Sequence, residues 1–499
     1  WLLRWLSLKP KVEWMATAES TIIDWIEYNG STTCPRIWET YSASERVVNW
    51  LLYFAATAKY NALSDSTKKT ITGSLLVHLR FIVGNLEYQH YSCNNHILNN
   101  ARALYIGGQL LGLPQASELG RLLFCRHLPE MVDEEGFLQE GSSHYQLLLI
   151  RTLLEILWVA QQTGDTEFKV VIEPVIIAML DCCRRFFHQG ASENACHFLR
   201  IGDVSPDFPI YWFIPLPSIK NQNGSWWELW DDQIEKILFS SSEHSSLVER
   251  KEGCLKILEN SKNMTRVFIS NPLTNETYPA PHGHLDFGSF SYYDHEGAVV
   301  VDRGRYSYTQ DGVGQYGYSA RAHNTTVING LPILPASRGI FIGYKDFIQK
   351  RSAFRIDYFA GRAKWSSRAI ERLGGDIEWQ RDLMLEADGL SVSEKLSSLH
   401  GKILFVESYL HFAPEWTVTA VQPAALESHS FDLVTEKRAY RIVITCDDAH
   451  IVPNWLVGTE TGEDGWHFPE YGEKEKALTL KLSLTTTSNF TIQWELKRQ

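Results

Sequence analysis

The hydrophobic periodicity of this chain changes part-way along its length, and this change limits the folds open to it. Up to about residue 245, apolar residues recur every three or four positions, as in "ERVVNWLLYFAATAKYNAL" and "NNARALYIGGQLLGLPQASELGRLLF". This spacing is typical of amphipathic helices. Polar, glycine and proline residues break the pattern in "YNGSTTCP", "DEEGFLQEGSS" and "HQGASENACH". We therefore expect helical hairpins that pack side by side in a bundle or a ring.

After about residue 265 the period becomes two. The segments "GAVVVDRG", "KILFVESYLHF", "WTVTAVQ" and "YRIVITCDD" alternate and are rich in valine, isoleucine, threonine and aromatic residues, as strands are. Turn signals such as Asn329-Gly330 and Asp388-Gly389 occur without helical segments between them, which favours antiparallel sheets stacked as a sandwich. The sequence predicts an α+β multidomain chain with a helical domain at 1–245 and a β-sandwich domain at 246–499. We expect the boundary within residues 234–253.

Composition excludes several classes of protein. Apolar residues make up 44% and charged residues 21% of the chain, as in globular proteins. The formal charge of −12 disfavours a general nucleic-acid or anionic-membrane binder, although a locally basic cleft could still hold an anionic substrate. The apolar stretch "HYQLLLIRTLLEILWVAQQ" is interrupted by Arg151 and Glu155, so we predict no membrane span. Eight cysteines show no spacing of a disulfide framework or zinc knuckle.

Two polar clusters precede helical segments. In "CNNHILNNARAL", Asn94, Asn95 and His96 open a helical run. They are either an ordinary asparagine N-cap or a group of donors that binds an anion at the positive end of a helix. In "LQEGSSHYQLLLIR", Ser142 or Ser143 is expected to cap a helix. Tyr145 then either packs on the core or exchanges protons with a substrate, provided that nearby cations lower its pKa from about 10.

Two further clusters lie in the part with strand periodicity. If "PAPHGHLDFGSF" is a strand, then His282, His284 and Asp286 share one face, although a solvent-facing edge would explain these residues equally well. Asp302 ends one apolar segment, and His323 begins another. Histidine and aspartate side chains from separate strands form a plausible zinc ligand set with an open position. The alternative is that they are satisfied polar residues at strand ends.

Taken together, the order of these motifs resembles the heparinase II/III superfamily of polysaccharide lyases, which includes alginate lyases. The similarity is carried by "WETYSASERVVNWLLYF", "NNHILNNARAL", "EGSSHYQLLLIRTLLEIL", "HGHLDFGSF", "VVVDRGRYSY" and "RAHNTTVING". Beyond about residue 335, only general β-sandwich character matches. The resemblance implies an incomplete α/α toroid followed by an antiparallel β-sandwich. Members usually carry sequence before the part that corresponds to Trp1, so we expect the toroid to be short or to lack an N-terminal piece.

The resemblance also implies β-elimination on a uronate-containing anionic polysaccharide, with roles for particular residues. Asn95 and His96 match positions that neutralise the uronate carboxylate. Tyr145 matches the tyrosine that donates a proton to the leaving oxygen and, for one substrate stereochemistry, also takes the C5 proton. His282 matches the histidine that serves as the alternative base. We expect a phenol from the helical half and an imidazole from the sheet half to face each other, and we expect substrate contacts from Glu140, Tyr308 and Arg321.

The same resemblance places a structural zinc ion on His284, Asp302 and His323. It thereby separates the two histidines of His282-Gly283-His284, both of which the spacing alone allowed as ligands. A metal ion at His284 would hold the segment rigid and fix His282 in place. The resemblance favours a periplasmic or secreted protein, and the sequence leaves its oligomeric state open.

Two other functions remain open from the sequence. A glycoside hydrolase on the same helical scaffold would use paired carboxylates such as Glu135 and Glu140. A polysaccharide-binding protein with a degenerate site would bind a polymer and leave its length unchanged. The polymer itself is equally open, because heparan-like, alginate-like and bacterial capsular polysaccharides all contain uronates.

Overall fold

The computed structural model contains two compact units. The first unit comprises the described residues up to 139 together with 146–184, and the second comprises 140–145, 185–206 and the described residues from 255 onward. The predicted boundary segment, 234–253, lies outside the described residues. The structure describes residues 12–30, 34, 36–58, 63–88, 94–189, 196–206, 255–271, 280–310, 312–335, 354–368, 377–398, 403–421, 428–447, 449–459 and 463–499.

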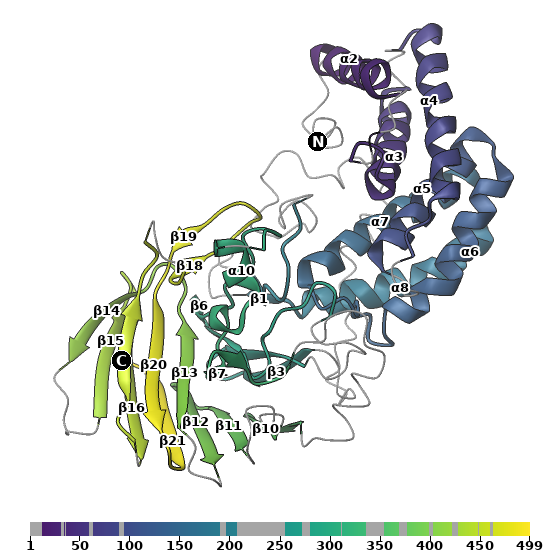
Figure 1. Cartoon of the computed structure of the whole chain (residues 1–499). Coiled ribbons are helices and arrows are strands. Elements are labelled where there is room, and N and C mark those ends of the chain that lie inside the picture. Colours follow the sequence, from purple (N-terminus) through teal and green to yellow (C-terminus); the bar gives the residue numbers. More distant parts are fainter. Residues whose placement is uncertain are drawn as a thin grey trace. The chain divides into compact units, whose positions relative to one another are not determined.

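Long helices follow one another through the N-terminal part of the chain (Figure 1). They are α2 (Val12–Asn29), α3 (Thr40–Thr57), α4 (Asp65–Gly84), α5 (Asn95–Leu111), α6 (Pro114–Met131), α7 (Ser143–Thr163) and α8 (Thr166–Arg184). Short connections join several of them, as expected for helical hairpins. The helical prediction for this region is confirmed. None of the described helices is long and apolar enough to cross a membrane.

Capping residues in the sequence set several helix ends. The Asn94 side chain accepts hydrogen bonds from the backbone N–H groups of His96 and Ile97, so it is the N-cap of α5. The helix ends at Gly112, whose φ of 68° is left-handed, and Pro114 opens α6. Ser142 Oγ accepts from the backbone N–H of Tyr145 and begins α7 in the same way. The capping interpretation of both polar clusters is therefore confirmed.

A buried network of charges joins α3, α5 and α7 in the first unit. Arg102 is fully buried and donates from Nη1 to Glu45 at 2.5 Å and from Nε to Glu155 at 2.5 Å. Arg151 also donates to Glu45, at 3.0 Å. Burial opposes ionisation of Glu45, but the two guanidinium groups outweigh it and lower the Glu45 pKa to about 2. These charges are stable in the interior only as a set, because each would otherwise be desolvated and unpaired.

The C-terminal part consists of antiparallel strands (Figure 1). The described residues form an eight-stranded sheet in the order β14-β15-β16-β21-β12-β11-β10-β9, a five-stranded sheet in the order β17-β20-β13-β7-β8 and a four-stranded sheet in the order β3-β4-β5-β6. The strands of the first sheet are β9 (Arg355–Phe359), β10 (Arg362–Ser367), β11 (Ile377–Leu385), β12 (Gly389–Ser398), β14 (Thr417–Val421), β15 (Ser428–Val434), β16 (Ala439–Asp447) and β21 (Phe490–Arg498).

The other two of these sheets have five and four strands. The five-stranded sheet contains β7 (Thr326–Ile328), β8 (Leu331–Pro332), β13 (Leu404–His411), β17 (Val452–Leu456) and β20 (Thr479–Thr486). The four-stranded sheet contains β3 (Leu255–Asn260), β4 (Thr265–Ser270), β5 (Ser291–Asp294) and β6 (Gly297–Val300). Two-stranded pairs are formed by β1 (Phe187–Gln189) with β2 (Cys196–Phe198) and by β18 (Trp466–His467) with β19 (Glu475–Lys476). An antiparallel sheet-rich C-terminal region was expected and is confirmed.

Local sequence explains the register of individual hairpins. Asn329 and Gly330 both have positive φ, 50° and 74°, and form the two-residue turn between β7 and β8. This is the backbone geometry that an Asn-Gly hairpin requires. Along β11, buried residues alternate with more exposed ones from Ile377 onward, so every second side chain enters the core.

Two buried polar side chains connect the sheets to the loops that carry the polar motifs. Arg381 of β11 pairs with Glu394 and donates to the carbonyl oxygens of Gly288 and Asn324. The Asn324 amide donates to the carbonyl oxygens of Phe290, at 2.8 Å, and Val301, at 2.9 Å. Asn324 follows His323, and Val301 precedes Asp302 in sequence. These hydrogen bonds therefore fix the backbone beside two of the predicted metal ligands, His323 and Asp302.

We predict that Arg102→Ala lowers the free energy of unfolding by about 3–5 kcal/mol, because Glu45 and Glu155 lose a buried counter-charge. Urea unfolding followed by circular dichroism at 222 nm would measure this change. The matched control is Lys68→Ala, which removes an exposed ion pair with Asp65 at 3.6 Å and should alter stability by no more than about 0.5 kcal/mol. Equal shifts in the two variants would contradict the importance of the buried network.

Candidate functional site

The motif "HGHLDFGSF" forms an irregular loop, and the next strand, β5, begins at Ser291. The premise that His282, His284 and Asp286 share a strand face is therefore wrong. The loop is held instead by main-chain hydrogen bonds to two other segments. The His282 N–H donates to the Glu140 carbonyl at 2.9 Å, and the Asp203 N–H donates to the His282 carbonyl at 2.8 Å. Three segments far apart in sequence thus meet at His282.

Tyr145 and His282 lie directly against each other. Their rings stack with centroids 3.5 Å apart and an interplanar angle of 14°. The Tyr145 hydroxyl shares a hydrogen bond of 2.7 Å with the Tyr308 hydroxyl. Although Tyr145 lies in the first turn of α7, it groups with the second compact unit, as His282 and Tyr308 do. Two phenols and one imidazole, all able to exchange protons, therefore form one cluster.

Asp203 is the acidic residue at the base of this cluster. Its carboxylate is almost fully buried, and it accepts from His282 Nδ1 at 3.0 Å and from His284 Nε2 at 2.9 Å. Arg305 Nη1 donates to it at 2.7 Å. Burial opposes ionisation, but the hydrogen bonds from the two histidines outweigh it and hold the Asp203 pKa well below its usual range. The sequence analysis missed Asp203, because the segment "IGDVSP" carries neither a periodic pattern nor a recognisable spacing to the histidines.

Arg305 and Tyr308 complete the electrostatics of the cluster. The Arg305 guanidinium lies 4.8 Å from the ring centroid of Tyr308 and 5.3 Å from that of Tyr318. Burial and the negative charge of Asp203 nevertheless raise the pKa of Tyr308. Tyr308 is therefore a neutral hydroxyl at ordinary pH, able to donate a hydrogen bond to Tyr145.

The predicted metal ligands also come together. One ligand atom from each of His284, Asp302 and His323 lies within 4.8 Å of the others. Among the described residues, Nδ1 of His284 and Nε2 of His323 are buried and find no hydrogen-bond partner. Nδ1 of His323 lies 2.6 Å from an oxygen of Asp302. Burial lowers the pKa of His284, which favours the neutral imidazole that a metal ion requires. This donor set, with nitrogen atoms that lack partners, fits a divalent cation such as zinc.

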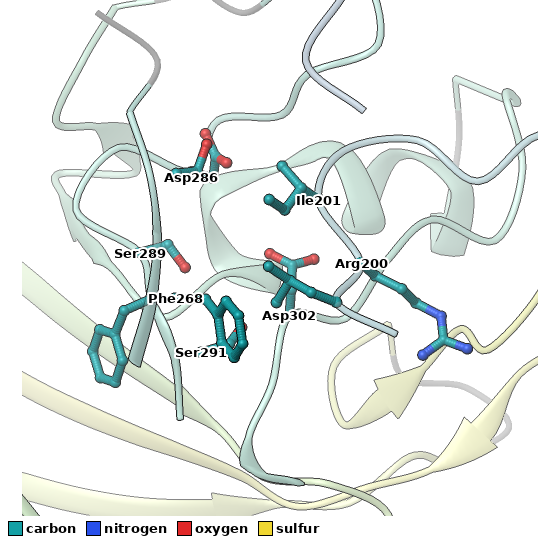
Figure 2. A pocket seen from close by; sticks show the side chains of 10 residues that line it. Arg200, Ile201, Phe268, Asp286, Ser289, Ser291 and Asp302 are labelled. Atoms are coloured by element: carbon teal, nitrogen blue, oxygen red, sulfur yellow. The ribbon is translucent and has the colours of Figure 1, made fainter. Parts of the chain in front are cut away.

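A small pocket of about 20 Å³ adjoins the same group (Figure 2). Asp286, Ser289 and Asp302 contribute polar side chains to its wall, and Ile201 and Phe268 contribute apolar ones. A cavity of this volume accommodates about one water molecule. It is too small for a sugar ring, so this pocket is part of the surroundings of Asp302 and is not a substrate site.

Asn95 and His96 belong to the first unit, where Glu87 holds His96 in place. His96 Nδ1 lies 3.1 Å from one oxygen of Glu87, and the Asn100 amide donates to the other oxygen at 2.9 Å. Burial opposes ionisation of Glu87, but the hydrogen bonds from His96 and Asn100 outweigh it and lower the Glu87 pKa. The Tyr41 ring packs against His96 with centroids 4.7 Å apart. Glu87 is a second residue that the sequence analysis missed, since it precedes the helix in a segment without periodicity.

The remaining predicted site residues have mixed surroundings. Glu140 is buried, and its carbonyl accepts from His282 as described above. Arg321 is part-exposed and pairs with Asp464 at 2.6 Å and with Glu463 at 3.8 Å. Substrate binding by these residues stays a prediction. Glu135 and Glu140, the carboxylates of the hydrolase alternative, fall in different compact units.

A family model described as heparinase II/III-like, C-terminal, matches residues 251–495, which include the histidine motif, Asp302, Tyr308 and His323. Residues 251–495 belong to the family of heparinase II/III-like C-terminal domains. The resemblance inferred from the order of the motifs is thereby confirmed. No curated protein matches this chain by sequence.

Solved structures of similar fold include several lyases. A heparinase III has a TM-score of 0.68 at 12% identity, and the match covers 98% of this chain and 74% of that one. A mutant of the heparan sulfate lyase HepC from Pedobacter heparinus has a TM-score of 0.62 at 12% identity with the same coverage. A mutant of the chondroitin AC lyase from Streptomyces coelicolor A3 has a TM-score of 0.51 at 11% identity, covering 98% of this chain and 71% of that one. At these identities the likeness concerns the fold.

We predict that Gly202→Ala disrupts the Tyr145–His282 cluster. Gly202 has a φ of 67°, and a Cβ there would lie 2.3 Å from the carbonyl oxygens of both Gly141 and His282. The backbone would have to move to avoid these contacts. The free energy of unfolding should therefore fall by more than the roughly 1–2 kcal/mol that a left-handed conformation alone costs a residue other than glycine. The matched control is Gly472→Ala, with a φ of 80° and open space around the site. A Gly202→Ala protein as stable as the control would contradict the packing described here.

Proposed function

We propose that this chain cleaves a uronate-containing anionic polysaccharide by β-elimination and leaves 4,5-unsaturated uronate ends. The observation that supports this proposal best is the cluster of Tyr145, His282 and Tyr308, in which a phenol contacts both an imidazole and a second phenol. β-Elimination requires one group that removes a proton from carbon and another that protonates the departing oxygen. This cluster has the chemical groups for both.

The reaction proceeds in three linked changes. A base takes the proton from C5 of the uronate, the C4–oxygen bond breaks, and an acid gives its proton to the departing glycosidic oxygen. The C5 proton is only weakly acidic beside a charged carboxylate, so donors that strengthen their hydrogen bonds as enolate character develops are needed. In this proposal, Asn95 and His96 supply these donors. Glu87 supports the role of His96, because a carboxylate that accepts from Nδ1 fixes the orientation of the imidazole ring.

Tyr145 is the proposed acid, and His282 is the proposed base. When Tyr145 gives up its proton, negative charge develops on its oxygen. The Tyr308 hydroxyl, 2.7 Å away, can donate to that oxygen and lower the free energy of the charged form. Tyr308 remains protonated for this task because its pKa is raised by burial. For the opposite stereochemistry at C5, Tyr145 takes the proton and returns it to the departing oxygen.

Two structural features complete the proposal. We infer that the helical region is an incomplete α/α toroid and that the sheets stack as an antiparallel β-sandwich. We also infer that His284, Asp302 and His323 hold a structural divalent metal ion, most naturally zinc. When bound, such an ion would cross-link three chain segments and restrict the loop that carries His282. This inference is supported by the buried nitrogens of His284 and His323, which have no hydrogen-bond partner within the described part of the chain.

We predict that the purified protein, incubated with a panel of heparan-like, alginate-like and capsular uronic polymers, generates products that absorb in the ultraviolet from a new conjugated double bond. Tyr145→Phe should lower kcat by about 10²–10⁴-fold. Glu140→Gln should have a smaller effect, since the reaction requires no second carboxylate. A hydrolase would reverse this order and give products without the chromophore, and an inactive binding protein would leave polymer length unchanged. Polymer cleavage without the absorbance would therefore rule out elimination.

We also predict that the purified protein contains stoichiometric zinc, measured by inductively coupled plasma mass spectrometry. His284→Ala should lose the metal, whereas His429→Ala, on β15, should retain it. Chelation should lower the melting temperature of the unaltered protein, because the metal binds only the folded chain. The His284→Ala protein should show no such shift, and equal metal contents in the two variants would exclude this site.

A further inference from the structure

A single carboxylate contacts both the proposed base and a proposed metal ligand. Oδ2 of Asp203 lies 3.0 Å from His282 Nδ1, and Oδ1 lies 2.9 Å from His284 Nε2. Asp203 itself is 2% exposed, and its main chain is fixed on both sides. Its N–H donates to the His282 carbonyl at 2.8 Å, and its carbonyl accepts from Ser142 Oγ at 2.7 Å. The carboxylate therefore has little freedom to move relative to either ring.

An ionised carboxylate can only accept hydrogen bonds, so each imidazole must place a proton on the nitrogen that faces Asp203. In the neutral ring, the other nitrogen then carries the lone pair. For His284 this nitrogen is Nδ1, which is buried, has no hydrogen-bond partner in the ranges that the structure describes, and belongs to the group with Asp302 and His323. For His282 it is Nε2. The two rings thus use opposite nitrogens toward the same carboxylate.

We propose that Asp203 is a positioning residue that sets the tautomers of both His282 and His284, so that one ring presents a basic nitrogen to substrate and the other presents a ligand nitrogen to a metal ion. This inference rests on the proposed lyase function and deepens it. The arrangement follows the general rule that a base is oriented by a third group, and that a metal-binding histidine donates its other N–H to a carboxylate. In this protein one residue serves both purposes.

Arg305 makes the two oxygens of the Asp203 carboxylate inequivalent. Its guanidinium donates to Oδ1, the oxygen that also accepts from His284. A guanidinium has no acceptor, so in an Asp203→Asn variant the amide oxygen must occupy the Oδ1 position. The amide NH₂ would then face His282 Nδ1. His282 would have to accept there, and its proton would move to Nε2, where it blocks proton abstraction.

The experiment uses the full chain and the uronic polymer that the unaltered protein degrades fastest. Asp203→Asn should lower kcat by about 10²–10⁴-fold, the size expected for a base in the wrong tautomer, with KM within about threefold of the unaltered protein. Its zinc affinity, measured by competition with a chelating dye, should be unchanged because His284 keeps its acceptor. Asp203→Ala should lose kcat and also weaken zinc binding by about 10–100-fold.

Two further variants serve as controls. Asp382→Asn makes the same substitution at a carboxylate that pairs with Arg362 on the sheet, and it should leave kcat, KM and zinc affinity unchanged. The double variant Asp203→Ala, Arg305→Met avoids leaving a buried guanidinium unpaired, so it replaces Asp203→Ala if that protein does not fold. The same loss of zinc affinity is expected in the double variant.

A kcat of Asp203→Asn within about twofold of the unaltered protein would overturn the proposal. So would full zinc affinity after removal of the Asp203 side chain. A loss of kcat that is fully accounted for by a lower folded fraction, measured by circular dichroism at 222 nm, would assign Asp203 a structural role only. Failure of the unaltered protein to make unsaturated products would instead refute the lyase proposal, and the zinc measurements would still test the effect of Asp203 on His284.

Discussion

The hydrogen bonds to the buried carboxylate of Asp203 are the interaction on which the candidate site depends. Three donors from two segments, His282 and His284 from one loop and Arg305 from another, meet at its two oxygens. An unpaired carboxylate at this depth would be strongly destabilising, so these donors stabilise Asp203 as much as Asp203 orients them. Because His282 also stacks on Tyr145, the geometry of the proposed acid and base follows from the placement of this one acidic group.

Buried polar side chains elsewhere in the second unit have a related structural role. Arg381 and Asn324 hold carbonyl oxygens of the loops that lead to the proposed metal ligands, and Asn324 alone contacts two loops and β13. Apolar packing is non-directional and could not fix a loop to within a few tenths of an ångström. Hydrogen bonds from buried donors can fix the position of a loop, because a buried carbonyl that lost its donor would destabilise the fold. The precision required of a catalytic cluster therefore comes from the polar part of the core.

Several individual expectations show how far sequence patterns extend. Asn94 and Ser142 are helix caps, as expected. The catalytic roles of His96 and Tyr145, which lie in the first turns that these residues cap, stay proposals. By contrast, the expectation of a strand at His282 failed because the loop is determined by contacts with Glu140 and Asp203, which no local pattern encodes.

The sequence by itself determined the order of helices and antiparallel strands, the helix caps, the Asn-Gly hairpin and the family, because these depend on periodicity and on the local chemistry of neighbouring residues. It also named the residues of the proposed acid, base and metal group. Only the tertiary structure decided that Asp203, some 80 positions from the histidines, joins them, and that Tyr308 contacts Tyr145. The physical reason is that these contacts arise where distant segments pack together, and hydrogen bonding between them leaves no periodic trace in the chain.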